Sequence, residues 1–310
     1  MKVVVTGGAG FIGANLARAL ASAGHEVVAV DDLSTGFRSN LLGVPATLLE
    51  GSILDPDLLD DAMAGAGAVV HLAARPSVPR SLADPMASHL TNATGTLEVL
   101  EAVRRAGDAH VIVASSSSVY GANPAIPKVE DLVPMPMSPY AASKLATESY
   151  ALAHAASFGM DVLAFRFFNV FGPLQAAGHA YAAVIPAFID AALAGRPLHV
   201  HGDGQQTRDF TFVDTVTAVI AEAIDRRVSS DRPVNLAYGS RVSLLELIDL
   251  LARVLGAELT VEHGPGRVGD VRDSQADQTR LRSLFPDVQP IDLESGLRAT
   301  IDWFRAPATA

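Results

Sequence analysis

The chain contains no cysteine among its 310 residues. Disulfide bonds, thiolate metal sites and cysteine nucleophiles are therefore excluded as sources of stability or chemistry. The absence is consistent with a reducing compartment, so we expect a cytoplasmic protein. Lys2 and the apolar stretch after it have some features of a signal peptide, but several glycines and Arg18 interrupt that stretch and favour strand, turn and helix.

Basic residues are scarce, with 23 Lys and Arg against 34 Asp and Glu and a formal net charge of −11. Such a protein repels nucleic acid and anionic lipid unless cations gather at one site, so we expect neither partner. Any phosphate-bearing ligand must be met by local basic side chains. No run of about 18 uncharged apolar residues occurs, so no membrane span is expected.

Over the first two thirds of the chain, short β-branched runs alternate with longer Ala- and Leu-rich segments of helical spacing. This alternation is typical of βαβ units around a parallel sheet. The predicted strands are Val3–Val5, Val27–Val30, Thr47–Leu49, Val69–Leu72, Val111–Ala114 and Val162–Phe167. The predicted helices lie near Gly13–Ala23, Asp57–Ala64, Ala87–Ala106 and Tyr140–Phe158. The sequence predicts a doubly wound α/β fold, a Rossmann sheet with helices on both faces.

Loop-like Gly- and Pro-rich stretches at 172–181 and 195–204 then interrupt this pattern. We interpret them as excursions into a smaller α/β lobe that binds substrate, made of about 169–211 and 240–310. Residues 1–168 and about 212–239 would form the nucleotide-binding domain. The later predicted elements are Phe210–Val213, Val216–Arg226, Val234–Ala237, Leu244–Leu255, Leu259–Glu262 and Gly296–Phe304, of which Val234–Ala237 is a strand returning to the sheet.

A glycine-rich turn, with Gly7, Gly10 and Gly13, follows the first strand and opens the first helix. In that position backbone amides can approach a pyrophosphate at the positive end of the helix. Asp31 and Asp32 end the second strand, where a carboxylate accepts hydrogen bonds from ribose hydroxyls and repels a 2′-phosphate. The combination favours NAD over NADP. The alternative is a tight turn and a helix cap without a ligand.

Tyr140 and Lys144 begin a predicted helix, and their i,i+4 spacing places the phenol and the ammonium on one face. A nearby cation stabilises a phenolate, which can then act as a general base. The serine run Ser115–Ser118 lies just beyond the fifth predicted strand, at the edge where doubly wound folds bind ligands. Without these flanking motifs, the serines would suggest a solvated loop.

These motifs resemble one family across nearly the whole chain. The glycines, Asp31, His71–Ala74, Ser115–Gly121 and Tyr140 with Lys144 resemble an extended short-chain dehydrogenase/reductase. Arg166–Gly172 and Arg208–Phe210 also resemble its UDP-hexose 4-epimerase branch. The resemblance implies NAD as a tightly held cofactor and a UDP-sugar as substrate. It also implies a homodimer formed through Ala87–Ala106 and Tyr140–Phe158, whose alanines permit close helix approach.

By resemblance, Ser116 is the catalytic hydroxyl, Tyr140 the base and acid, and Lys144 the ribose-binding cation, and no metal is implied. The residues that it places at NAD are Gly7, Gly10, Phe11, Ile12, Gly13, Asp31, Asp32, Leu33, Ser34, Thr35, Gly36, Ser52, Ile53, Leu72, Ala73, Ala74, Asn92, Ser115, Tyr140, Lys144 and Phe167. Those that it places at the UDP-sugar are Ser77, Ser116, Ser117, Asn169, Ala183, Val184, His201, Arg208, Arg267, Asp270 and Ser274. Ser52 departs from the family's usual Asp, which bears on adenine contacts. His71 is expected to be a packed strand histidine.

Relatives that dehydrate or decarboxylate their sugars carry acidic residues in the serine segment, where this chain has Ser117 and Ser118. The lack of a second acid or base favours redox at carbon 4 alone, which is all that epimerisation needs. Three alternatives stay open: a nucleotide-sugar 4-ketoreductase, a dehydratase of the same family, and a non-catalytic NAD-binding regulator.

Several positions bear on which sugar is bound. Arg208 and Arg267 resemble diphosphate ligands, although each could instead pair with Asp209 or Asp270 on the surface. Asn169 favours neutral hexoses, because relatives acting on UDP-glucuronate often have Thr there. By resemblance, Ala183 stands where strict UDP-glucose epimerases have Asn, and Ser274 stands where they have a bulky residue. Both residues of this chain are small. Both positions therefore favour an N-acetyl sugar, and a roomy pocket admits the smaller hexose as well.

Overall fold

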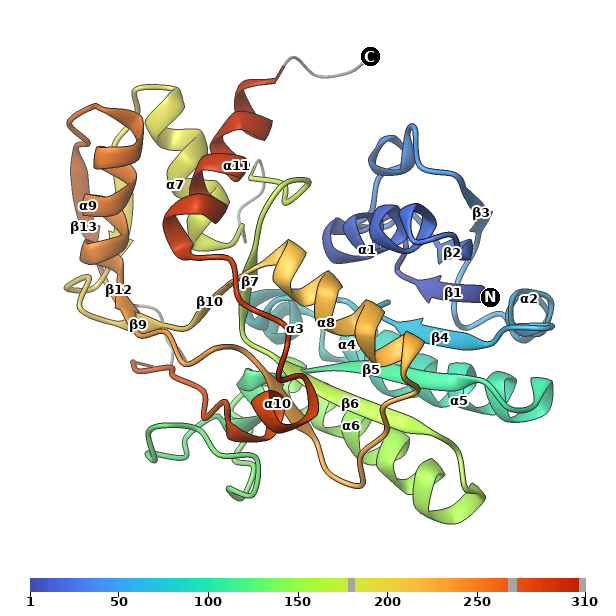
Figure 1. The fold of residues 1–310 in the computed structure, drawn as a ribbon. Helices are drawn as coiled ribbons and strands as arrows, with labels where there is room; N and C mark the ends of the chain where they lie inside the picture. The colour runs from blue at the N-terminus through green and yellow to red at the C-terminus, as the bar shows by residue number, and fades with distance from the viewer. Residues whose placement is uncertain (178–181, 267–271, 307–310) are drawn as a thin grey trace.

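The computed structural model describes residues 1–177, 182–266 and 272–306. Its centre is a parallel seven-stranded sheet in the order β11-β6-β5-β4-β1-β2-β3 (Figure 1). The strands are β1 (Lys2–Thr6), β2 (Glu26–Asp31), β3 (Ala46–Glu50), β4 (Ala68–His71), β5 (His110–Ser116), β6 (Val162–Phe167) and β11 (Val234–Leu236). The six predicted strands and the returning seventh are all present, so the predicted doubly wound α/β class is confirmed.

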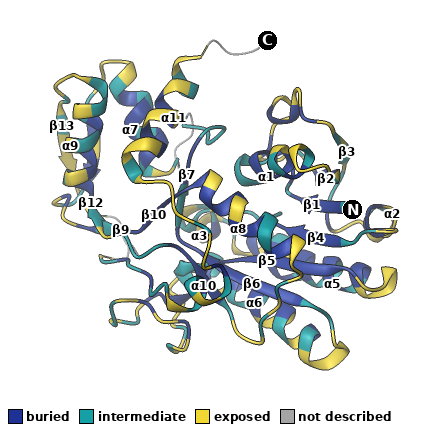
Figure 2. Ribbon diagram, viewed as in Figure 1, coloured by how far each residue is buried: buried dark blue, intermediate teal, exposed yellow. Residues whose placement is uncertain are grey.

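Helices cover both faces of this sheet because neighbouring residues on a strand point to opposite sides. Val3 and Val5 pack with α1 (Phe11–Ser22) and α8 (Val213–Asp225) in one apolar core. Val4 belongs to a second core on the other face, with α2 (Pro56–Met63), α5 (Gly95–Ala106) and α6 (Pro139–Phe158). In Figure 2 the strands at the centre of the sheet are buried, and many exposed residues lie on the outer surfaces of the helices and on the loops.

The predicted helix Ala87–Ala106 is not a regular α-helix. It consists of α4 (Pro85–His89), a π-helical turn at Leu90–Thr94, and α5. In this turn the regular α-helical hydrogen-bond pattern is interrupted. The carbonyl oxygen of Asn92 accepts hydrogen bonds from the hydroxyls of Thr96 and Thr147, at 2.5 and 2.8 Å. The π-turn therefore ties this helix to α6.

The predicted smaller lobe supplies most of a third apolar core, which includes Phe171, Ile189, Leu247 and Ile301. Its elements are β7 (Asn169–Phe171), α7 (Val184–Leu193), β8 (Leu198–His201), β9 (Thr207–Arg208), β10 (Phe210–Phe212), β12 (Val242–Ser243), α9 (Leu244–Leu255), β13 (Val261–Gly264) and α11 (Leu293–Arg305). Figure 1 shows α7, α9 and α11 grouped to one side of the sheet.

Some predicted boundaries in the smaller lobe were wrong by two or three residues. The strand expected at Leu259–Glu262 is β13, and the helix expected at Gly296–Phe304 begins at Leu293, because Asp292 caps it by accepting a hydrogen bond from the amide of Ser295. The remaining short elements are η1 (Arg38–Leu41), α3 (Val78–Ala83), η3 (Ser117–Tyr120) and α10 (Thr279–Leu284). Within the described residues, no helix is both long and apolar enough to cross a membrane.

Candidate active site

A cavity of about 1190 Å³ lies along the carboxyl edge of the sheet, where doubly wound folds bind ligands. One wall is formed at the ends of β1, β2, β4, β5 and β6, and the opposite wall by α7, β8 and β9. Most of the predicted site residues line this one cavity. The fold therefore brings together predicted site residues that are far apart in the sequence.

The glycine-rich loop between β1 and α1 is packed too closely for side chains. A Cβ atom on Gly7 would lie 2.7 Å from the amide nitrogen of Ala73, and one on Gly13 would lie 2.1 Å from the carbonyl oxygen of Gly7. Gly7 also has a φ of +71°, which L side chains rarely adopt. The loop leaves the first turn of α1 facing the cavity, and this geometry fits the pyrophosphate of a dinucleotide.

Asp31 holds this loop in place from the end of β2. Its carboxylate accepts hydrogen bonds from the amides of Ala9 and Leu33, both at 2.9 Å. Burial raises the pKa of Asp31. The carboxylate still lines the cavity, so it can contact a ribose while it fixes the loop.

The structure separates the predicted cofactor residues into two groups. Leu33, Gly36 and Asn92 do not line the cavity; Gly36 instead lies against Ala9, where a Cβ would come within 2.8 Å of backbone. The members that do line it are Gly7, Gly10, Phe11, Ile12, Gly13, Asp31, Asp32, Ser34, Thr35, Ser52, Ile53, Leu72, Ala73, Ala74, Ser115, Tyr140, Lys144 and Phe167.

Tyr140 and Lys144 lie in the first turns of α6, which Ser138 caps by accepting a hydrogen bond from the amide of Ala141 at 3.1 Å. The Nζ atom of Lys144 donates to the carbonyl of Ala114 on β5, at 2.8 Å. Burial lowers the pKa of Lys144 to about 8. This contact fixes the ammonium at the end of the strand that also carries Ser116.

Ser116, the last residue of β5, lines the cavity with Tyr140. Burial raises the pKa of this phenol, and the hydrogen bond from Ser116 acts in the opposite direction. The structure therefore brings the three predicted catalytic residues together on one cavity wall.

His71 is a packed strand histidine, as predicted. Its ring nitrogens contact the hydroxyls of Thr6 and Thr96 at 2.7 and 3.0 Å, and it is 1% exposed. Burial, with a smaller contribution from the charge of Lys144, lowers the pKa of His71 to about 3. The imidazole is thus a neutral structural group beneath the site.

Asn92 holds the loop after β4 against α6. Its side chain accepts from the amide of Arg75 at 2.7 Å, donates to the carbonyl of Arg75 at 3.3 Å, and donates to the hydroxyl of Ser143 at 2.9 Å. The residue is fully buried. In this structure Asn92 shapes the site through Arg75 and Ser143.

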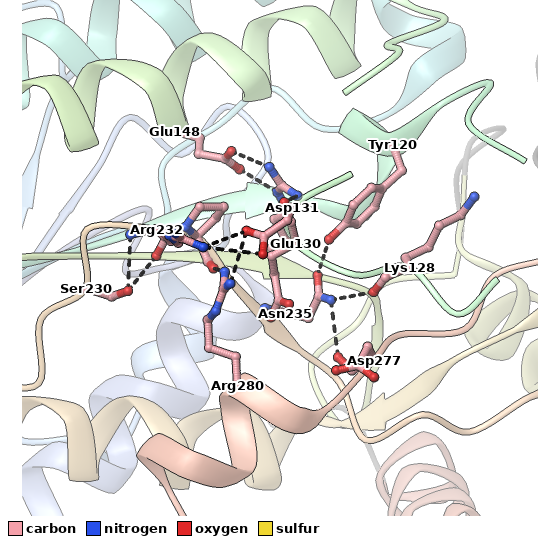
Figure 3. Close-up of polar contacts among 12 residues, drawn as sticks. Tyr120, Lys128, Glu130, Asp131, Glu148, Ser230, Arg232, Asn235, Asp277 and Arg280 are labelled. Carbon is pink, nitrogen blue, oxygen red and sulfur yellow. Dashed lines mark hydrogen bonds and ion pairs between the residues drawn. The ribbon is translucent and has the colours of Figure 1, made fainter. Parts of the chain in front are cut away.

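A buried polar network behind the site was missed by sequence reasoning. The guanidinium of Arg166 on β6 forms a two-pronged ion pair with Glu148 on α6, at 2.6 and 2.8 Å, and lies 4.7 Å from the ring centre of Tyr120. Tyr120 in turn donates to Asn235 at 2.6 Å (Figure 3). The sequence contained one indication of Glu148. It is four residues beyond Lys144 and so lies one turn further along the same helix.

The predicted sugar-binding residues are also divided. Ser77, Ser116, Asn169, Ala183, Val184, His201 and Arg208 line the cavity, Ser117 and Ser274 do not, and Arg267 and Asp270 lie outside the described residues. The amide of Asn169 donates to the carbonyl of Asp209 at 3.2 Å, and the guanidinium of Arg208 donates to the carbonyl of Thr207 at 2.8 Å. Arg208 therefore brings a cation to the wall opposite the cofactor loop.

Asp209, the neighbour of Arg208, is fully buried. Its carboxylate accepts hydrogen bonds from the hydroxyl and amide of Ser240 and from the amide of Ala276, at 2.9 to 3.2 Å. Burial raises the pKa of Asp209 to about 6. Asp209 thus anchors the backbone beside Arg208 rather than lying on the surface.

The geometry agrees with comparisons to known proteins. The model of the NAD dependent epimerase/dehydratase family matches residues 3–237. The chain belongs to this family. It is therefore an NAD-dependent enzyme of the extended short-chain dehydrogenase/reductase type, and its relatives include enzymes that act on nucleotide sugars.

Its relatives include more than one activity. A UDP-glucose 4-epimerase from Mycolicibacterium smegmatis is 38% identical over 98% of this chain and 99% of its own length. A dTDP-glucose 4,6-dehydratase from Streptomyces griseus is 36% identical over 97% and 93% of the two chains. The solved structure of a UDP-N-acetylglucosamine 4-epimerase from Methanobrevibacter ruminantium, with UDP-N-acetylmuramic acid, has a TM-score of 0.92 at 36% identity, covering 98% and 97%.

Proposed function

We propose that this enzyme is a UDP-hexose 4-epimerase that interconverts UDP-N-acetylglucosamine with UDP-N-acetylgalactosamine, and UDP-glucose with UDP-galactose. One observation carries the choice among the family's reactions. Among the described residues that line the cavity, the carboxylates are Asp31 and Asp32, both at the end of β2 beside the glycine-rich loop. Relatives that dehydrate their sugars resemble enzymes with an acidic pair where this chain has Ser117 and Ser118, whereas epimerisation at carbon 4 needs one proton shuttle.

In this proposal Tyr140 takes the proton of the 4-hydroxyl and later returns it to the 4-keto oxygen. NAD, when bound, supplies the acceptor and donor for the hydride at carbon 4. Lys144 favours the phenolate of Tyr140 by its charge, and Ser116 donates a hydrogen bond to the same oxygen. Rotation of the keto sugar in the large cavity then lets the hydride return to the opposite face.

The N-acetyl preference rests on the residues that line the cavity near α7. Ala183 precedes this helix and lines the cavity with Val184, and the single methyl group of Ala183 leaves room for an acetamide. Ser274 is buried and does not line the cavity. The steric argument for an N-acetyl sugar therefore rests on Ala183. We propose that both sugars bind and that the N-acetyl sugars are processed at least as fast.

Proton NMR of the purified enzyme with UDP-N-acetylglucosamine and, separately, UDP-glucose tests this proposal. We expect the anomeric signal of the galacto product to grow without added reductant. A parallel sample with dTDP-glucose should stay unchanged, and formation of a 4-keto-6-deoxy sugar there would instead establish a dehydratase.

A ketoreductase or a regulator would give different results. If no epimer forms, and a 4-keto nucleotide sugar consumes NADH stoichiometrically, the enzyme is a 4-ketoreductase. A non-catalytic regulator would bind NAD and turn over none of these sugars. The presence of Ser116, Tyr140 and Lys144 around one cavity supports an active enzyme.

We also propose that the enzyme is a cytoplasmic homodimer formed through α4, α5 and α6. Exposed apolar side chains on these elements support this surface. Leu90 in the π-turn is 44% exposed and Tyr150 on α6 is 41% exposed. Exposed apolar groups gathered on neighbouring helices are typical of protein interfaces.

A further inference from the structure

Ser118 is two residues beyond Ser116, in the turn η3, and its hydroxyl points at the catalytic one. The Ser118 hydroxyl donates to the Oγ atom of Ser116 at 2.9 Å, and the amide of Ser118 donates to the same atom at 3.2 Å. A serine oxygen has two acceptor positions and one hydrogen. Both acceptor positions of Ser116 are therefore occupied by Ser118.

This occupancy decides what Ser116 can do toward Tyr140. Because its lone pairs are engaged, Ser116 can act toward Tyr140, which lines the same cavity, only by donating its hydrogen. A donor stabilises the phenolate, which accepts, in preference to the neutral phenol, which needs an acceptor for its own hydrogen. We propose that Ser118 is a positioning residue that holds Ser116 as a permanent hydrogen-bond donor to Tyr140 and so favours the base form of the catalytic pair.

The surrounding charges do not depend on Ser118. Lys144 lies on the same helix as Tyr140, and His71 beneath them is neutral. The other charged or titratable groups among the described residues that line the cavity are Asp31, Asp32, Arg80, His199, His201 and Arg208. None of these is altered by substitution at position 118, so a comparison of variants at this position isolates the hydroxyl.

The test measures the ionisation of Tyr140 directly, in the NAD-containing enzyme. Protein labelled with 13C at the tyrosine ring carbon that bears the hydroxyl gives signals from the five tyrosines, and the Tyr140 signal is the one missing in Tyr140→Phe. We compare Ser118→Ala, Ser118→Val and Ser118→Thr, because Thr keeps the hydroxyl and Val has nearly the same shape without it.

We expect Ser118→Ala and Ser118→Val to raise the titration midpoint of Tyr140 by about one pKa unit, and Ser118→Thr to stay close to wild type. An unchanged midpoint in Ser118→Ala would overturn the proposal. An equal rise in Ser118→Thr and Ser118→Val would also overturn it, because packing and not the hydroxyl would then be the cause.

The consequence for catalysis rests on the proposed function and is measured separately. If Tyr140 is the base in sugar epimerisation, the acidic limb of the kcat/KM profile in Ser118→Ala moves up by the same amount, a loss of about tenfold below the limb. A shifted midpoint without a shifted limb supports the role of Ser118 and contradicts the assignment of Tyr140 as base. A shifted midpoint with no turnover of any UDP-sugar contradicts the proposed function alone.

Discussion

Tyr140 lines the same cavity as Ser116 and Lys144, so its removal has a sharp expected outcome. Tyr140→Phe deletes one oxygen and leaves the ring that packs in the cavity wall. We expect a folded protein that still contains NAD, with epimerisation slower by at least about a hundredfold, because the group proposed to shuttle the proton of the 4-hydroxyl is gone. Progress curves from NMR measure the rate, and activity near that of wild type would disprove the mechanism.

His71 makes the folded state sensitive to acid. Its pKa is about 3 in the folded protein and 6.5 when solvated, so the neutral form stabilises the fold fully above pH 6.5, and this contribution is lost as the pH falls toward 3. Between pH 7 and pH 5 the wild type should lose about 2 kcal/mol of unfolding free energy from this residue. Urea denaturation at both pH values measures the loss. The non-titrating His71→Gln should show a correspondingly shallower dependence, and parallel curves would contradict the assignment.

Among the elements, the loop between β1 and α1 tolerates little change. Gly13→Ala places a methyl group 2.1 Å from the carbonyl oxygen of Gly7, which must move and carry the loop with it. We expect binding of NAD to weaken by about tenfold or more. NAD released on denaturation of the purified protein measures retention. As a control, Gly266→Ala meets no atom within 4 Å and should retain NAD like wild type.

Helix α6 is joined to β6 by a buried charge pair. Glu148→Ala leaves the Arg166 guanidinium buried without its partner, which should cost about 3–5 kcal/mol of unfolding free energy. Arg298→Ala breaks the exposed pair of Arg298 with Glu294 and should cost less than about 1 kcal/mol. Chemical denaturation compares the two. Equal losses would show that the buried pair has no special role in holding the catalytic helix.

The elements also show what could be predicted from the sequence. Strands such as Val3–Val5 and Val111–Ala114 were predictable because apolar β-branched runs between turn residues have few alternatives in an α/β chain. The π-turn around Asn92 was not, because it depends on hydroxyls of Thr96 and Thr147, one of which comes from another helix. Local periodicity contains no information about such partners.

The candidate site divides in the same way. Gly7, Tyr140 and Lys144 belong to motifs whose spacing is local, so they could be placed at the site before the structure was known. The pairing of Glu148 with Arg166 and the contact of Ser118 with Ser116 depend on side-chain directions that spacing alone does not fix. Asn92 was expected at the cofactor, yet its amide is used by Arg75 and Ser143.

For the whole molecule, the proposed dimer gives a test that needs no substrate. A charge on exposed apolar residues of the proposed interface should separate the subunits, because an unpaired carboxylate is costly to bury. We expect the double variant Leu90→Glu, Tyr150→Glu to be monomeric by light scattering at concentrations where wild type is dimeric. Met137→Glu, at a 55% exposed position just before α6, should stay dimeric. A monomeric wild type would refute the dimer.

The two walls of the cavity come from different stretches of the chain. The glycine-rich loop and the end of β2 belong to the first 36 residues, while Asn169, Ala183, His201 and Arg208 belong to a later segment. Mutations can therefore accumulate in the later segment without touching the loop that fits the dinucleotide. Because of this separation, related enzymes can evolve to accept new sugars by changes in the later segment. The glycine-rich loop and the end of β2, which fit the cofactor, can stay the same.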